Sequence, residues 1–304
     1  MERKYVLGID IGGTSIKIGI ISGSYLVESF TLRNNFKGKC NLFIAGIKPT
    51  IDSFIERYHI TKIGIGCPGE IQNGVVLLAS NLGWVNYNIK EDFQNNYPNM
   101  EIVVDNDGNA ACLAEKKYGL LKGKDNGIYI TLGKGVGGAI IINNKIMMGN
   151  HGMGGRFGHM VIKENGRHCA CGRRGCFEIY GSITGLILTV REINNRQQDE
   201  SKKIDLSKIS GYQIVKYVIA GNETVIEAVK RWNNDLAEGI LNLCMIFDID
   251  DIVIGGGITE SGLIDIPFIK SKLAPFGYEK CNLSIATFKG KTGLIGAAAL
   301  VQDD

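Results

Sequence analysis

One local pattern occurs twice in the chain: an apolar strand, a glycine-rich turn and a second apolar strand. The first copy covers residues 5–21, with its turn at 11–14, and the second covers residues 127–142, with its turn at 133–138. Two strands joined by a short glycine turn form a hairpin. The repetition predicts a duplicated α/β architecture of two lobes with a cleft between them.

The rest of the chain alternates between helix and strand patterns. Apolar residues at helical spacing predict a helix over residues 41–58. The other predicted elements are strands at 63–67, 102–105 and 252–255, helices at 110–118 and 293–301, and mainly helical structure over 183–247. A glycine- and lysine-rich linker at 119–127 separates a small α/β lobe (1–118) from a larger lobe (119–292). We expect the C-terminal segment 293–304 to pack back on the small lobe.

Composition excludes several classes of protein. The 304 residues are 44% hydrophobic and 21% charged, which is ordinary for a soluble globular chain and unlike a disordered one. A net charge of +3 without a clustered basic face gives no reason to expect nucleic-acid or membrane binding. The chain has no run of 18 apolar residues and no signal-peptide pattern, so we expect a cytoplasmic protein.

Three of the eight cysteines are clustered: Cys169, Cys171 and Cys176. Together with His159 they make a Cys₃His set, which is complete for tetrahedral zinc and leaves no open catalytic position. The sequence therefore predicts a structural zinc ion. His168 is an alternative fourth ligand, and reduced cysteines without metal are the structural alternative.

The first glycine turn contains Gly12, Gly13 and Thr14, with Asp10 at the end of the strand before it and Lys17 shortly after it. Glycines let backbone N–H groups approach phosphate oxygens, and an Asp at a strand end can hold the water shell of Mg²⁺. For an isolated match, a plain hairpin turn would be the better interpretation.

The second glycine turn contains Thr131, Gly133, Lys134 and Gly135. It matches G-x-G-x-x-G, but a β-like run follows where a dinucleotide-binding motif needs a helix, and the chain has no P-loop. A second phosphate-facing hairpin fits better, with a tight β-turn as the alternative. Gly256, in a late glycine triplet, can lie against an adenosine or can simply open a helix.

Residues 105–107 read Asp-Asn-Asp between a predicted strand and a predicted helix. For Asp105 we favour a helix cap. For Asp107 we favour a general base, because phosphoryl transfer to a hydroxyl needs a group that accepts its proton. Asn81 can hydrogen-bond sugar hydroxyls and Trp84 can cover a sugar face, but a surface loop with a half-buried Trp84 is equally compatible.

The order and spacing of these motifs resemble the ROK family from end to end. The resemblance implies the ribonuclease-H-like, actin-like ATPase fold. It also implies either an ATP-dependent hexose or N-acetylhexosamine kinase or a transcriptional repressor. The repressors carry an N-terminal helix-turn-helix domain. Because the first motif begins at residue 10, we expect no such domain here.

The resemblance also implies roles for individual residues. Asp107 would deprotonate the sugar 6-hydroxyl, Asp10 would position Mg²⁺, both glycine turns would cradle ATP phosphates, and Gly256 would lie near the nucleoside. The residues that would line or support the sugar pocket are Gly69, Asn81, Asn106, Arg156, His159 and Glu178. A homodimer is common in the family and is expected here.

Two residues depart from the family pattern. The sugar-binding motif E-x-G-H reads Arg156-Phe-Gly-His159 here, and Lys134 stands where the family usually has Thr or Ser. Arginine cannot accept a hydrogen bond as glutamate does. This leaves three hypotheses: a kinase with altered sugar choice (an anionic or N-acylated sugar), a weakened glucokinase-like enzyme in which Arg156 swings out, and a catalytically poor sugar sensor.

Overall fold

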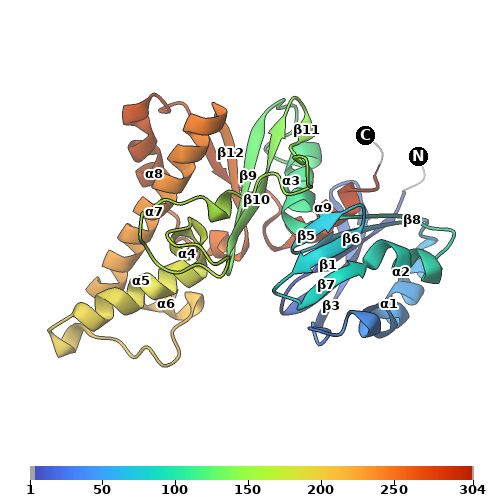
Figure 1. The fold of residues 1–304 in the computed structure, drawn as a ribbon, viewed down its shortest axis with the longest axis horizontal. Helices are drawn as coiled ribbons and strands as arrows, with labels where there is room; N and C mark the ends of the chain where they lie inside the picture. Colours follow the sequence, from blue (N-terminus) through green and yellow to red (C-terminus); the bar gives the residue numbers. More distant parts are fainter. Residues whose placement is uncertain (1–3, 303–304) are drawn as a thin grey trace. The chain divides into compact units, whose positions relative to one another are not determined.

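The computed structural model describes residues 4–302. The chain forms two compact units and contains two five-stranded sheets (Figure 1). The first unit comprises Met1–Asp125, Ala139–Gly155 and Gly290–Asp304, and the second comprises Asn126–Gly138 and Arg156–Lys289. The domain limits expected from the sequence stay a prediction.

The first sheet begins with the predicted hairpin. Strands β1 (Val6–Ile11) and β2 (Ser15–Ser22) pair antiparallel, with Asp10 opposite Lys17. An unpredicted strand, β3 (Tyr25–Arg33), continues the antiparallel side. The predicted strands β4 (Lys62–Cys67) and β8 (Glu101–Asn106) pair parallel on the other side of β1, which gives the order β3-β2-β1-β4-β8.

Helices cover both faces of this sheet, because β1 is apolar on both faces. Leu7 and Ile9 share one core cluster with buried residues of α1 (Phe43–Tyr58), the helix predicted over 41–58. Val6 faces the other way and packs with α9 (Thr292–Ala299) in a second cluster. The approach of α9 is close: a β-carbon at Gly64 on β4 would lie 1.8 Å from the Ala297 carbonyl oxygen.

A small three-stranded sheet in the first unit was not predicted from the sequence. It consists of β5 (Glu70–Gln72), β6 (Val75–Ala79) and β7 (Trp84–Asn88), in that order. Two helices complete the unit: α2 (Ile89–Asn96), and α3 (Asp107–Tyr118), which begins three residues before the predicted helix.

The second sheet repeats the topology of the first. Its strands are β9 (Gly127–Leu132), β10 (Val136–Ile142), β11 (Lys145–Ile146), β12 (Asp251–Gly255) and β13 (Asn282–Ile285). Their order is β11-β10-β9-β12-β13, and β12 runs parallel to both β9 and β13. Counted in chain order, both five-stranded sheets read 3-2-1-4-5. The predicted duplication is confirmed.

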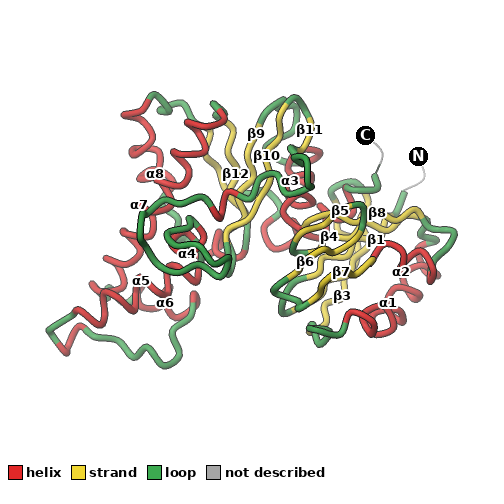
Figure 2. Tube along the Cα trace, in the orientation of Figure 1, coloured by secondary structure: helices red, strands yellow, loops and turns green. Residues whose placement is uncertain are grey.

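Helices make up most of the remainder of the second unit, as predicted for residues 183–247 (Figure 2). They are α4 (Glu178–Gly181), α5 (Ile183–Arg196), α6 (Gly211–Ile219), α7 (Glu223–Phe247) and α8 (Ile266–Leu273). Trp232 of α7 is fully buried and donates from Nε1 to the Gly181 carbonyl oxygen at 3.0 Å, which ties α7 to α4. Within residues 4–302, no helix is both long and apolar enough to cross a membrane.

Candidate functional site

The glycine turn of the first unit is held by an asparagine that the sequence did not single out. Within the turn, the Gly12 N–H donates to the Ser15 carbonyl oxygen at 2.8 Å. Asn34, buried just beyond β3, donates from Nδ2 to the Gly12 carbonyl oxygen at 2.7 Å and from its backbone N–H to the Thr14 carbonyl oxygen at 3.0 Å. The turn is therefore fixed by two contacts from a residue about 20 positions later in the chain.

Asp10 and Lys17 lie beside each other at the base of this turn, as their pairing on β1 and β2 requires. Lys17 Nζ lies 4.0 Å from Asp10 Oδ2 and donates to the Gly290 carbonyl oxygen at 2.9 Å. Burial raises the pKa of Asp10, and the ammonium group of Lys17 partly offsets that rise. The start of α9 faces the same carboxylate, because a β-carbon at Gly293 would lie 2.3 Å from Asp10 Oδ2.

The Asp-Asn-Asp segment occupies the junction of β8 and α3. Asn106 is the helix cap, because its Oδ1 accepts from the N–H groups of Gly108 and Asn109. The expectation that Asp105 caps the helix is therefore wrong. Asp105 Oδ1 instead accepts from the Asn106 backbone N–H and from Asn109 Nδ2, and burial raises its pKa.

Asp107 is the first residue of α3 and lies near the negative charge of Asp10. Its Oδ1 accepts from the Gly108 N–H at 2.9 Å. The pKa of Asp107 is raised to about 6. Burial is the main cause, the negative charge of Asp10 acts in the same direction, and the hydrogen bond from Gly108 acts against it. A carboxyl group with such a pKa is mostly ionised at neutral pH yet can accept a proton readily, which suits a general base.

Two more residues expected in the sugar pocket lie close to these groups. The Gly69 carbonyl oxygen accepts from Asn106 Nδ2 at 2.9 Å. Asn81 is exposed and adjoins the first glycine turn, since a β-carbon at Gly13 would lie 3.7 Å from Asn81 Cβ. The structure thus brings Gly69 together with Asn106, and Asn81 together with Gly13, inside one unit.

Trp84 is not a surface residue, and both expectations for it are wrong. Only 1% of its surface is exposed, and its Nε1 donates to the Phe36 carbonyl oxygen at 2.9 Å. Its ring packs edge to face against Phe43 of α1, with the ring centroids 5.0 Å apart. Trp84 is therefore a core residue below the Asn81 loop and cannot cover a sugar.

The glycine turn of the second unit is hydrogen-bonded to the start of α5 and to Glu178. The Gly133 carbonyl oxygen accepts from the Ile183 N–H at 2.9 Å, and the Lys134 carbonyl oxygen accepts from Thr184 Oγ1 at 2.7 Å. Glu178 Oε2 accepts from the Val136 N–H at 3.1 Å. The side chain of Lys134 is exposed, and that of Glu178 fits because Gly135 has no β-carbon.

Thr131 and Gly256 lie at the ends of two adjacent strands of the second unit. Thr131 pairs with Gly255 in the parallel ladder between β9 and β12. Gly256 follows directly with a φ of 98°, and a β-carbon there would lie 2.1 Å from the Leu132 carbonyl oxygen. Only glycine can hold the backbone this close to the end of β9.

The four predicted metal ligands form one cluster. Donor atoms of His159, Cys169, Cys171 and Cys176 all lie within 4.8 Å of one another. His159 Nδ1 is 3.7 Å from Cys169 Sγ, and Cys171 Sγ is 3.6 Å from Cys176 Sγ. A tetrahedral ion with metal–sulfur bonds of about 2.3 Å would place its sulfur ligands about 3.8 Å apart, so this donor set fits zinc. His168 lies outside the cluster and forms a β-bridge with Arg174 instead.

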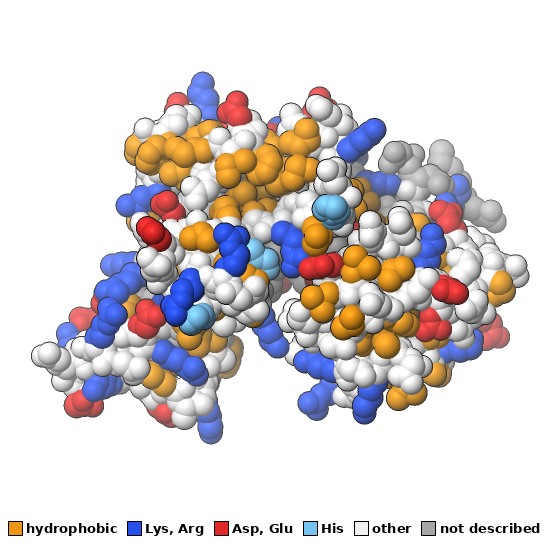
Figure 3. Space-filling view, in the orientation of Figure 1, with side chains coloured by type: hydrophobic (Ala, Val, Ile, Leu, Met, Phe, Trp, Pro, Cys, Tyr) orange, Lys and Arg blue, Asp and Glu red, His pale blue; other side chains and the backbone are white. Residues whose placement is uncertain are grey.

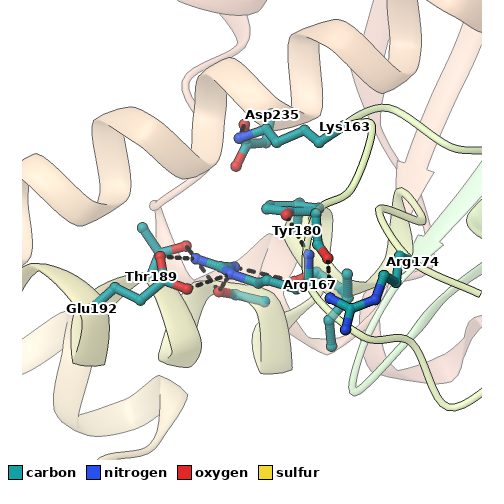
Figure 4. Close-up of polar contacts among 10 residues, drawn as sticks. Lys163, Arg167, Arg174, Tyr180, Thr189, Glu192 and Asp235 are labelled. Atoms are coloured by element: carbon teal, nitrogen blue, oxygen red, sulfur yellow. Dashed lines mark hydrogen bonds and ion pairs between the residues drawn. The ribbon is translucent and has the colours of Figure 1, made fainter.

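Arg167 anchors the cysteine loop to the helices below it, as Figure 4 shows. Its guanidinium makes a two-pronged ion pair with Glu192 of α5 at 2.7 and 2.8 Å and lies over the Tyr180 ring. The pairing lowers the pKa of Glu192. The Arg167 backbone N–H donates to the Tyr180 hydroxyl at 2.8 Å. These contacts hold the loop in place only two residues before Cys169. No sequence motif indicates them.

Glu178 and residues 156–159 lie between the cysteine cluster and the second glycine turn and contact both. Glu178 Oε1 accepts from Cys169 Sγ at 3.8 Å, while its other oxygen contacts Val136. Arg156 is exposed and directly precedes the short 3₁₀ helix η2 (Phe157–His159), which carries His159. A β-carbon at Gly158 would lie 2.0 Å from the Val136 carbonyl oxygen, so this helix also abuts the turn.

The repeated sheet topology and the paired glycine hairpins define a two-lobe α/β protein of the actin-like ATPase type. Within that class, the chain belongs to the ROK family, whose model matches residues 6–304.

Its relatives include both kinases and regulators. A glucokinase of Halalkalibacterium halodurans is 30% identical over 99% of this chain and 96% of its own length. The xylose repressor of Bacillus subtilis is 28% identical over 81% of this chain but only 62% of the repressor. A ROK family glucokinase from Streptomyces griseus, solved with glucose and AMPPNP, superimposes with a TM-score of 0.81 at 26% identity, covering 97% of this chain and 98% of that one.

Proposed function

We propose that this protein transfers the γ-phosphoryl group of ATP to the 6-hydroxyl group of a hexose or N-acetylhexosamine. The observation that carries the proposal is Asp107: a carboxylate at a helix N-terminus with its pKa raised to about 6, beside Asp10. A glycine turn lies in the same unit, and a relative of the same fold was solved with a sugar and an ATP analogue.

The proposed chemistry is a single displacement. Asp107 accepts the proton of the sugar hydroxyl while the hydroxyl oxygen forms a bond to the γ-phosphorus. The bond from that phosphorus to the β–γ bridging oxygen breaks, and ADP is released. Most of the rate enhancement would come from positioning and from backbone N–H groups that stabilise the phosphates. The turns at Gly12–Thr14 and Gly133–Gly138 would provide those N–H groups, and Gly256 would lie near the nucleoside.

Asp10 fits the role proposed for it toward Mg²⁺. Mg²⁺ in kinases is held by one or two carboxylates, several waters and the substrate phosphates, and it neutralises phosphate charge during transfer. Asp10 supplies one carboxylate at the end of β1. Burial raises the pKa of Asp10 and Lys17 partly offsets that rise, and a bound divalent cation would favour the ionised carboxylate further.

For the Cys₃His cluster we propose a structural zinc ion. All four ligands come from one loop region of 18 residues, His159–Cys176, and they leave no position for substrate. The ion would hold η2 and the cysteine loop in place, and η2 in turn abuts the second glycine turn at Val136.

Arg156 bears on sugar choice. It directly precedes η2 and is exposed, in the place where the family motif has an acceptor. An arginine there favours a sugar with an anionic or N-acyl group over a neutral hexose. A second candidate function, a sugar-binding regulator of weak catalytic power, is favoured by this same substitution and by the repressor among the relatives.

A coupled assay of ADP release over a panel of hexoses, N-acetylhexosamines and sugar acids tests the proposal. We expect sugar-dependent ADP release for at least one of them. We also expect Arg156→Glu to lower activity on an anionic substrate by about tenfold or more, the order expected for a lost charge-assisted contact, and to raise activity on glucose. Ligand-dependent thermal stabilisation without ADP release from any sugar would contradict the kinase and support the regulator.

A further inference from the structure

Residues Asn34–Gly38 form a bracket between two loops of the first unit that are far apart in sequence. At one end, Asn34 contacts the glycine turn at Gly12 and Thr14. At the other end, the Gly38 N–H donates to the Leu82 carbonyl oxygen at 2.7 Å. The two loops are those proposed to bind nucleotide phosphate and sugar.

The turn end of the bracket sets the direction of a backbone donor. Asn34 Nδ2 holds the Gly12 carbonyl oxygen at 2.7 Å. None of the described peptide bonds is cis, so the N–H of the same planar peptide, which belongs to Gly13, points the opposite way. The bracket therefore directs the Gly13 N–H away from Asn34. A flexible glycine would not fix that direction by itself.

The sugar end of the bracket is equally well defined. Residues 79–83 form a tight turn in which the Leu82 N–H donates to the Ala79 carbonyl oxygen at 2.9 Å. Asn81 lies at the exposed tip of this turn. Below it, Trp84 donates from Nε1 to the Phe36 carbonyl oxygen at 2.9 Å, so the bracket is held at its middle as well as at its end.

The bracket itself is stiff. Asn34 Oδ1 accepts from the Phe36 N–H at 3.0 Å, which closes a local turn within it. The Phe36 ring packs edge to face on Phe43, which in turn packs on Trp84. Because Asn34 and Trp84 are buried, breaking either contact would leave a buried donor without its partner, which is costly.

We infer that the Asn34–Gly38 bracket couples sugar binding at Asn81 to nucleotide binding at the Gly12–Thr14 turn, with Asn34 as the positioning residue for the turn. The inference rests on the proposed function, which assigns those two ligands. A ligand that contacts the Asn81 loop acts on Leu82 and, through the stiff bracket, on the glycine turn. Two ligands that favour the same arrangement of the bracket then strengthen each other's binding.

The test is a binding cycle. AMPPNP with Mg²⁺ is titrated calorimetrically into the full chain with and without saturating sugar, taken as glucose and, separately, as the panel member with the highest kcat/KM. We expect sugar to tighten AMPPNP binding at least about fivefold, the lower end of typical coupling. Asn34→Asp, which places two acceptors against the Gly12 carbonyl, and Trp84→Phe, which removes the indole donor and keeps one aromatic ring in the core, should each bring that factor close to 1.

Asn194→Asp is the matched control. Asn194 is also buried, and its side chain accepts from the Ile204 N–H at 2.8 Å and donates to the Ile204 carbonyl oxygen at 3.3 Å, far along α5 in the second unit. This variant loses the same kind of amide contact and should keep the wild-type coupling factor. If the wild type phosphorylates sugar but shows no coupling, or if both bracket variants keep the wild-type factor, the inference is overturned while the proposed function stands. Absence of transfer from ATP to any sugar would instead refute the proposed function.

Discussion

Asp107 costs the folded protein stability at neutral pH, because its charge is buried beside that of Asp10. Its pKa rises from 3.8 to about 6 on folding, so the folded state binds the proton more tightly than the unfolded state does. The free energy of unfolding therefore falls as pH rises from about 4 to 6 and stays lowered above pH 7. The raised pKa that suits Asp107 to act as a general base therefore lowers the stability of the folded chain at neutral pH.

This cost predicts that Asp107→Asn stabilises the ligand-free protein. The expected gain is on the order of 2 kcal/mol above pH 7, reduced by the lost interaction of a carboxylate with the start of α3. The melting temperatures of variant and wild type should agree near pH 4 and diverge as pH rises to 7, measured by calorimetry from pH 4 to 8. A difference independent of pH would show that the Asp107 pKa is not raised in the folded state.

Single residues were the hardest part of the site to predict. The metal ligands and Asp10 with Lys17 follow from local spacing, because a short loop and a hairpin register bring them together. Asn34 and Gly293 carry no such signal, since their partners lie about 20 and about 280 positions away in the chain. The burial of Trp84 could not be predicted, because it depends on Phe36 and Phe43, which no local pattern links to it.

At the scale of elements, the cysteine loop gives the sharpest prediction. The purified chain should contain one zinc ion, measured by elemental mass spectrometry, and Cys171→Ala should remove most of it. Loss of the ion frees η2 and the loop, so amide hydrogen exchange over residues 157–182 should accelerate by about tenfold or more, while exchange in β1 and β2 should not change.

Cys40→Ala is the control for this experiment. Cys40 is half-buried and lies outside the cluster, in the first unit, so its removal should leave the zinc content unchanged. A full complement of zinc in Cys171→Ala, or unchanged exchange after removal of the metal, would contradict a structural ion at this site.

Among the elements, both hairpins and the strands next to them could be predicted, because their β-branched residues are buried on both faces and bounded by glycine. The edge strand β3 was missed because much of it is exposed, so it has no apolar period. Strands β5, β6 and β7 were missed because each is at most five residues long and lies between glycine and polar turns. That small sheet carries the Asn81 loop, so its omission also hid why Trp84 is buried.

At the scale of the whole molecule, the duplication could be predicted from the sequence, and the expected domain limits stay a prediction. The repeat of strand, glycine turn and strand survives as two sheets of the same order. The segment Ala139–Gly155, however, belongs to the first unit. This depends on long-range contacts such as the approach of Gly152 to the Ile71 carbonyl oxygen, which sequence patterns do not report.

The surface bears on the expected partners. In Figure 3, Lys and Arg side chains are scattered among Asp and Glu on the visible face, and hydrophobic side chains gather over the region of α8 and β12. Exposed apolar residues of the second unit include Ile219, Met245, Ile246 and Phe276. The homodimer stays a prediction that sedimentation velocity can check.

The central claim is that Asp107 takes the proton of a sugar hydroxyl during phosphoryl transfer, and the pH dependence of kcat/KM tests it most directly. With the best sugar of the panel, kcat/KM should fall tenfold per pH unit below about 6, as Asp107 becomes protonated. Asp107→Asn should lose about 10²- to 10⁴-fold in activity and with it the pH limb near 6. Asp92→Asn, which removes a carboxylate that accepts from the Tyr87 hydroxyl, should keep both. An Asp107→Asn variant with more than about a tenth of wild-type activity and an unchanged pH limb would contradict the account.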